Sequence, residues 1–268
     1  MSPTVDCLVV RATFLSSQIA PTETLGQSAR LLPMESLETL ARHVSPRGQV
    51  LLRRRIDEGH CIEELIINGV FAMDSSETST ESMLAELALP NEHAQRVLVG
   101  GLGLGYTVAA VSAQNVDAID VVEIEECLID WSHRGVTATL KTAAADPRTR
   151  LYAGDIREVF GDAPHGPVGP WDAIILDVDN GPDFLIFEEN SELYTDAGLR
   201  AAYARLTPGG TLAIWCQCPV PALSAALQRI APSAEEHIIE VVRGRRSFRY
   251  AIYTLSRPRN SIGRARQE

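Results

Sequence analysis

The sequence predicts an α/β protein: a doubly wound, mostly parallel sheet preceded by a small β-rich domain. From Val97 onward, short apolar runs typical of buried strands alternate with helical segments. Such alternation gives a parallel sheet that is covered by helices on both faces. Two β-rich runs around the basic segment 243–246 indicate a terminal antiparallel hairpin. Ahead of the alternation, strand-like runs on either side of the turn-prone segment 57–59 predict another hairpin.

The individual elements follow from this pattern. Strands of the main sheet are expected at 97–101, 116–125, 150–155, 171–178 and 211–218, and the terminal hairpin brings their number to seven. Helices are expected at 36–43, 81–88, 106–114, 126–135, 156–160, 193–206 and 222–230. The Asn68-Gly69 pair indicates a tight turn or a bulge. The predicted divisions are an N-terminal domain (1–92), the doubly wound domain (93–258) and a polar tail (259–268).

Composition narrows the class of protein. The 268 residues are 45% hydrophobic and 22% charged, and 35 acids against 24 basic residues give a net charge of -11. That sign disfavours nucleic acid and an anionic membrane surface as partners. No apolar run approaches the roughly 18 residues of a membrane helix, and the five scattered cysteines form no C-x-x-C pair. We therefore expect a cytoplasmic protein that acts on a small neutral or cationic molecule.

A glycine-rich segment, Gly100–Gly105, follows the first strand of the main sheet and opens its helix. Glycines let the backbone turn sharply and approach a ligand at a helix N-terminus, which suits electron-rich groups. Glu123 stands twenty residues past Gly103, where a carboxylate can accept hydrogen bonds from both hydroxyls of a ribose. Its neighbours Glu125 and Glu126 are expected to be solvated. Together the loop and Glu123 predict a nucleoside site.

Polar residues also follow the next two strands. Asp155 ends the third strand, where an acid can meet the amino group of adenine. Asp177 follows the most apolar strand and can hold or deprotonate an amine, whereas Asp179 and Asn180 suit a turn equally well. Ligands of doubly wound sheets lie beyond the carboxyl ends of the strands, so we expect these residues at one edge. The six dispersed histidines show no metal-ligand spacing, and no metal site is predicted.

At these residues the chain resembles the spermidine synthase family, a branch of the class I S-adenosylmethionine-dependent methyltransferase fold. The resemblance runs from about Gln49 to Leu255 through ELIINGVFAMD, VLVGGLGLG, VVEIEE, AGD and ILDVDNGP. It implies S-adenosylmethionine as cofactor, Asp177 as the catalytic aspartate and a homodimer formed through the N-terminal strands. The cofactor-binding set that it implies is Gly100, Gly101, Gly103, Gly105, Glu123, Ile124, Asp155, Ile156 and Asp177.

Departures from that family bear on the reaction. The family has an aspartate in the glycine-rich loop, which attracts the ammonium of decarboxylated S-adenosylmethionine and repels the carboxylate of the intact form. This chain has Gly103 at that place. The family's glutamine after the N-terminal strand is replaced by Ala72, and its acceptor-binding tyrosine by Thr80 or Glu81. These losses argue against a diamine held in the family's way.

The leading hypothesis is therefore methyl transfer from intact S-adenosylmethionine to a small molecule. The predicted catalytic residues are Asp177, Asn180 and Asp179, with Tyr106 shaping the pocket. One alternative is an aminopropyltransferase that uses the decarboxylated cofactor and holds a small amine through acids such as Glu77 and Glu81. Another is aminocarboxypropyl transfer. A nicotinamide-dependent dehydrogenase is more remote, because the loop lacks the third glycine at its usual interval.

Overall fold

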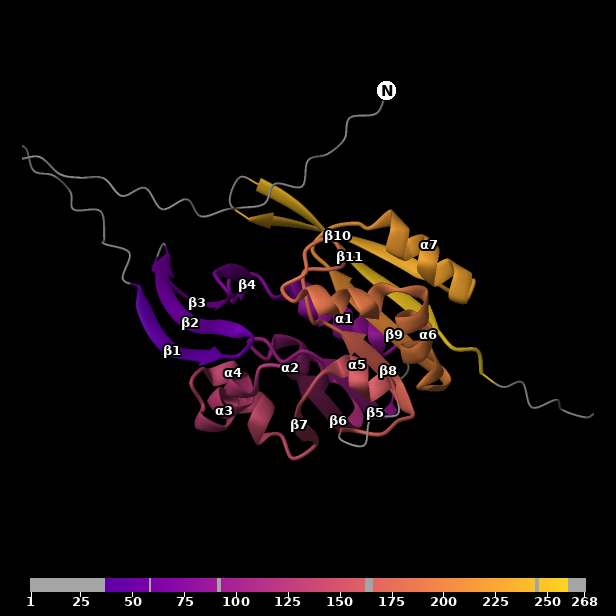
Figure 1. Ribbon diagram of the computed structural model, residues 1–268, viewed down its shortest axis with the longest axis horizontal. Helices are drawn as coiled ribbons and strands as arrows, with labels where there is room; N and C mark the ends of the chain where they lie inside the picture. The colour runs from indigo at the N-terminus through magenta and orange to yellow at the C-terminus, as the bar shows by residue number, and fades with distance from the viewer. Residues whose placement is uncertain (1–36, 58, 91–92, 162–165, 244–245, 260–268) are drawn as a thin grey trace, which may run out of the picture.

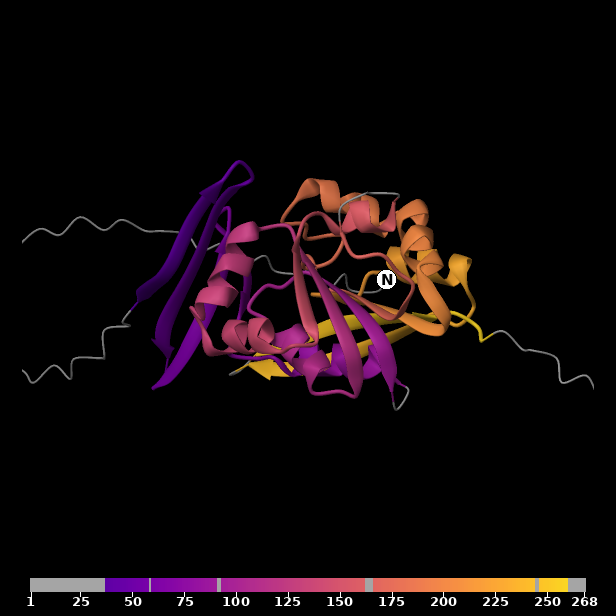
Figure 2. The same cartoon turned by 90° about the horizontal axis from the view of Figure 1, so that it is seen from below.

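The computed structural model describes residues 37–57, 59–90, 93–161, 166–243 and 246–259 (Figure 1). Within them lie a four-stranded sheet, in the order β1-β2-β3-β4, and a seven-stranded sheet, in the order β10-β11-β9-β8-β5-β6-β7. In Figure 2 the four-stranded sheet stands as a separate layer beside the helices of the larger one. The predicted fold class is confirmed. The expected polar tail lies almost entirely outside the described residues.

The small sheet is a meander of antiparallel strands. They are β1 (Glu38–Ser45), β2 (Gly48–Asp57), β3 (His60–Ile67) and β4 (Val70–Asp74). The helix expected at 36–43 is wrong, because residues 38–43 belong to a strand that pairs with β2, with one irregularity after Thr39, and gains the ladder hydrogen bonds of a hairpin. Asn68 (φ 54°) and Gly69 (φ 76°) form the tight turn between β3 and β4.

The large sheet is parallel except for its terminal hairpin. Its strands are β5 (Ala94–Gly100), β6 (Val116–Glu123), β7 (Thr149–Ala153), β8 (Trp171–Leu176), β9 (Leu206–Cys216), β10 (Glu235–Arg243) and β11 (Arg246–Ser256). β11 runs antiparallel to both β9 and β10, as predicted for the terminal hairpin. β9 begins earlier than expected, since the Pro208-Gly209-Gly210 segment continues the strand.

Helices cover both faces of the large sheet. The first face carries α1 (Ser79–Ala88), α2 (Tyr106–Ser112), α3 (Glu126–Arg134) and α4 (Ala138–Ala145), whose apolar side chains share one core with the small sheet. The second carries α5 (Ile156–Phe160), α6 (Asp196–Ala204) and α7 (Pro221–Ile230). No helix in the described part of the chain is long and apolar enough to cross a membrane.

Two helical segments differ from expectation. α4 was not predicted; the Thr137 side chain caps it by accepting from the Leu140 amide. The helix expected over 193–206 is divided into a 3-10 helix (Glu188–Tyr194) and α6. Thr195 separates them, since its extended backbone ends the first and its hydroxyl accepts from the Gly198 amide to begin the second.

A buried carboxylate of β6 contacts side chains from three other strands of the large sheet. Asp120, on β6, accepts hydrogen bonds from Arg96 Nε at 2.7 Å and Trp171 Nε1 at 2.9 Å. The Tyr152 hydroxyl approaches it at 3.4 Å. Asp120 is 1% exposed, so its charge is stabilised by these partners rather than by water.

Asp120→Ala should destabilise the protein by about 3 kcal/mol, because it leaves a partly buried guanidinium and an indole N–H without their acceptor. Urea unfolding monitored by circular dichroism measures this change. Asp117→Ala, at an exposed position of the same strand, should change the free energy of unfolding by at most about 0.5 kcal/mol. Equal effects of the two substitutions would contradict this role of Asp120.

Candidate functional site

The predicted site residues meet at one edge of the large sheet, beyond the carboxyl ends of β7, β6, β5 and β8. Backbone hydrogen bonds join the segments that follow the strands. The Gly101 amide donates to the Val122 carbonyl at 2.9 Å, and the Asp177 amide donates to the Gly100 carbonyl at 3.0 Å. The structure therefore brings the loop after β5 beside the ends of β6 and β8, where a doubly wound sheet binds its ligand.

The glycine loop (residues 100–105) has a backbone that side chains would obstruct. Gly101, Gly103 and Gly105 all have positive φ, at 91°, 51° and 86°. A Cβ on Gly101 would lie 2.2 Å from the Asp177 carbonyl oxygen. A Cβ on Gly103 would lie 2.7 Å from Met73 Sδ, which also accepts from the Leu104 amide at 3.3 Å. Met73, at the end of the small sheet, therefore fixes the conformation of the loop.

Glu123 braces the same loop. Its carboxylate accepts from the Leu102 amide at 2.7 Å and from the Glu125 amide at 2.8 Å. Burial raises the pKa of Glu123, while these backbone hydrogen bonds oppose the shift. Its binding of a ribose stays a prediction.

The residues after Glu123 depart from expectation. Glu125 is 1% exposed and pairs with Arg47 Nε at 3.0 Å, so the prediction that it is solvated is wrong. The Arg47 guanidinium also donates to the Ile124 carbonyl. An arginine from the turn of the β1–β2 hairpin thus holds the segment that follows β6.

Asp155 already accepts hydrogen bonds from two groups of Arg157. It caps α5 by accepting from the Arg157 amide at 2.8 Å, and its Oδ2 lies 2.6 Å from Arg157 Nη2. Ile156 is buried beneath it. An adenine amino group would share this carboxylate with Arg157, and that contact stays a prediction.

Asp177 is a half-buried carboxylate at this edge. The Thr107 hydroxyl donates to its Oδ2 at 2.6 Å. Desolvation by the surrounding protein raises the pKa of Asp177, which makes the group a better proton acceptor than an ordinary carboxylate. Thr107, in the first turn of α2, was not singled out in the sequence, although it follows the glycine loop directly.

The other two predicted catalytic residues have structural duties. Asp179 is buried and accepts from the Ile186 amide at 2.9 Å and from Asn190 Nδ2 at 2.7 Å, which holds the segment 181–190. Burial raises the pKa of Asp179 to about 6. The Asn180 carbonyl accepts from the Gln217 amide at 3.0 Å and joins this segment to the end of β9.

A second carboxylate accompanies Asp177. Glu81, in the first turn of α1, is buried, and the Thr80 hydroxyl donates to it at 2.7 Å. Burial and the nearby Asp177 charge raise the pKa of Glu81 to about 7. Asp74 and Glu77 precede α1. We call these four carboxylates, Asp74, Glu77, Glu81 and Asp177, the acidic cluster.

Tyr250 lies near the acidic cluster and belongs to a group of three aromatic rings. Trp215 and Tyr250 have ring centroids 5.5 Å apart, and Phe248 stacks with Tyr250 at 6.4 Å. Burial raises the pKa of Tyr250, and the charges of Asp74, Glu77 and Glu81 add to the shift. Carboxylates beside aromatic faces suit an alkylammonium group, which both attract.

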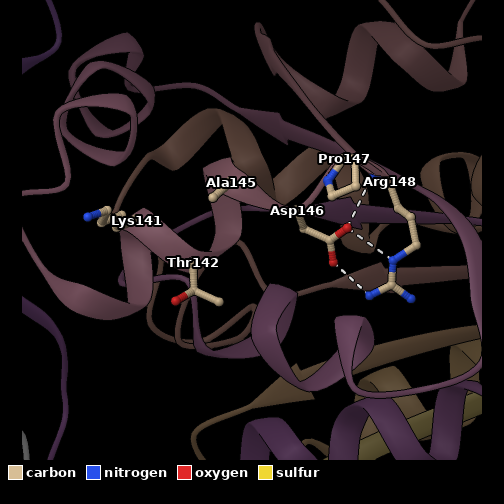
Figure 3. A pocket seen from close by; sticks show the side chains of 6 residues that line it. All are labelled: Lys141, Thr142, Ala145, Asp146, Pro147 and Arg148. Carbon is tan, nitrogen blue, oxygen red and sulfur yellow. Dashed lines mark hydrogen bonds and ion pairs between the residues drawn. The ribbon is translucent and has the colours of Figure 1, made fainter.

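A separate surface depression lies away from this edge. Its lining comes from the end of α4 and the turn into β7, and the Asp146–Arg148 ion pair closes one side (Figure 3). Arg148 holds the pKa of Asp146 at about 2. Because it lies at the amino end of β7, this depression is not part of the predicted site.

No family model matches the chain. The polyamine aminopropyltransferase of Nitrosomonas europaea is 28% identical over 126 residues, which cover 47% of this chain and 36% of that relative. The match thus spans little more than a third of the relative's length.

Solved structures match over more of the chain. A spermidine synthase in complex with the transition-state analogue AdoDATO has a TM-score of 0.68 at 17% identity, covering 84% of this chain and 75% of that one. The chain has the spermidine synthase fold. Spermidine synthase from Thermotoga maritima agrees, with a TM-score of 0.66 at 16% identity over 84% and 74% of the two chains. The resemblance stated from the sequence motifs is confirmed at the level of the fold.

The same fold serves other chemistry. Precorrin 8W decarboxylase of Methanobacterium thermoautotrophicum has a TM-score of 0.51 at 14% identity, covering 69% of this chain and 92% of that one. Because a fold alone does not determine a reaction, the reaction of this chain depends on the residues of the site.

Glu81→Gln should change how stability depends on pH. The pKa of Glu81 is near 7 in the folded protein and near 4.5 when unfolded, so the folded state binds the extra proton between these values. Stability is therefore lost as pH rises from about 4.5 to 7, by up to about 3 kcal/mol from this group. Urea unfolding at pH 5 and pH 8 measures this fall in the free energy of unfolding. The contribution of Glu81 to it should be absent in Glu81→Gln, because glutamine does not ionise.

Glu86→Gln is the matched control, since Glu86 is exposed on the same helix. It should leave the pH dependence of the wild type intact. An unchanged pH dependence in Glu81→Gln would contradict the burial of an ionisable group at this position.

Proposed function

We propose that this chain transfers a carbon group from the sulfonium of an S-adenosyl donor to a small amine, and that the group is aminopropyl. The comparisons favour this alternative over the methyl transfer expected from the loop, because the curated relative is named as a polyamine aminopropyltransferase and two similar structures as spermidine synthases. The observation that carries the proposal is the acidic cluster, which acts on Tyr250 at one end and reaches Asp177 at the edge of the sheet.

The residues at the strand ends fit an S-adenosyl donor. The glycine loop packs closely against the end of β8, because a Cβ on Gly101 would strike the Asp177 carbonyl, and this brings its backbone beside Asp177 at the edge where an S-adenosyl donor would bind. Glu123 and Asp155 follow neighbouring strands and offer carboxylate oxygens where a ribose and an adenine would lie. When bound, the donor supplies an electrophilic carbon and a neutral thioether leaving group.

In this mechanism Asp177 positions and deprotonates the amine. A protonated amine has no lone pair, so it must lose a proton before its nitrogen attacks the carbon next to sulfur. The new N–C bond forms as the C–S bond breaks, and the electron pair stays on sulfur. Asp177 takes the amine proton, for which its raised pKa suits it. Glu81 shares the amine's positive charge with Asp177 when it is ionised, that is, above its raised pKa of about 7.

One observation favours a second candidate, transfer of a methyl or aminocarboxypropyl group from intact S-adenosylmethionine. The glycine loop has no carboxylate: Gly103 has no side chain, and Leu102 and Leu104 are buried in the core. Nothing in this loop therefore repels the carboxylate of the intact donor. The homodimer, and the absence of nucleic-acid and membrane partners, stay predictions.

Asp177→Asn should lower kcat at least a hundredfold with the decarboxylated donor and a diamine, because the amide cannot accept the proton. Mass spectrometry of the acceptor measures the transfer and identifies the group. Asp130→Asn, at an exposed position of α3, should keep wild-type turnover. Transfer of methyl by the wild type would support the second candidate. Full turnover by Asp177→Asn would remove Asp177 from the mechanism.

A further inference from the structure

Arg243, at the end of β10, places a positive charge within the acidic cluster. Its guanidinium lies 5.9 Å from the ring centroids of both Phe248 and Tyr250. Its Nη1 is 3.8 Å from Asp74 Oδ1, in a pair whose arginine side chain is 33% and aspartate side chain 8% exposed. A cation is thus already present beside Asp74 and the rings of Phe248 and Tyr250.

The sheet register brings Arg243 and Trp215 to the same face. Trp215 pairs with Ile252 across β9 and β11, and Tyr250 and Phe248 follow at two-residue steps on the same face of β11. Phe248 pairs with Val241 of β10, and Arg243 lies two residues farther along. Side chains at such steps share a face, which agrees with the ring contacts of this group.

Two buried donors on this face lack an acceptor. Neither Arg243 Nε nor Trp215 Nε1 has a hydrogen-bond partner among the described residues, although both atoms are inaccessible to water. Buried N–H groups without an acceptor are costly and are expected to have one when the site is filled. Both groups can only donate, so they call for a ligand oxygen rather than an ammonium.

We propose that Arg243, assisted by Trp215, binds a carboxylate of one reactant at this end of the site. Arginine suits a carboxylate because its planar guanidinium can donate two parallel hydrogen bonds. The role of this ligand as a reactant rests on the proposed function, whereas the binding of a carboxylate to Arg243 does not. The carboxylate has two possible sources: an amino-acid acceptor, or the methionyl group of intact S-adenosylmethionine.

Titration calorimetry with two matched ligand pairs tests the proposal. The first pair is 4-aminobutyrate and 1,4-diaminobutane, and the second is S-adenosylmethionine and its decarboxylated form. Arg243→Gln should weaken binding of the carboxylate member of one pair by roughly tenfold to a hundredfold and leave its partner unweakened. Arg249→Gln is the control, since Arg249 lies on the opposite face of β11 and is exposed; it should change neither pair.

Trp215→Phe keeps an aromatic ring and removes only the Nε1 donor, so it should weaken the same ligand by a smaller factor. This variant preserves a test if Arg243→Gln fails to fold, which thermal unfolding would reveal. A loss in the first pair assigns the carboxylate to the acceptor, and a loss in the second assigns it to the donor. Equal affinity of wild type and both variants for every ligand would overturn the proposal.

The binding test is independent of turnover. Carboxylate binding through Arg243 without any group transfer would leave this inference standing and remove the proposed function. Transfer to diamines at the same rate in Arg243→Gln and wild type, with no change in carboxylate binding, would overturn this inference and leave the proposed function standing.

Discussion

The close contact between the glycine loop and the end of β8 is the constraint on which the site depends. Gly101 leaves no room for a Cβ against the Asp177 carbonyl, and the Asp177 amide donates to Gly100. This contact places the Asp177 side chain within reach of Thr107, at the start of the helix that the loop opens. A ligand cradled by the loop would therefore meet the carboxylate with the raised pKa directly.

The small sheet completes that arrangement from outside the doubly wound core. Met73 contacts the loop through its sulfur, and Arg47 pairs with Glu125 at the end of β6. The segment after Met73 leads into α1 and supplies the acids that face Tyr250. The small sheet thus contributes to both ends of the site: the loop that would hold the donor and the charges that would hold the acceptor.

Local patterns in the sequence predicted most of the large sheet, because buried parallel strands and glycine turns carry their own signals. The strand ends with Gly101, Glu123, Asp155 and Asp177 followed from that alternation. The strand β1 was not predicted, because its local sequence pattern favours a helix and its pairing with β2 overrides that preference. The partners Arg47–Glu125 and Asp74–Arg243 are 78 and 169 residues apart along the chain, so no local pattern could join them.

Hydrogen–deuterium exchange with and without decarboxylated S-adenosylmethionine, the donor of the proposed aminopropyl transfer, tests the central claim, that the strand ends form a nucleoside site beside the small sheet. We expect slower exchange in the glycine loop, around Glu123 and at the start of α5, with the turn near Arg47 protected as well. Protection confined to other segments, such as the depression at Asp146–Arg148, would contradict the account, as would no change at a saturating concentration of the ligand.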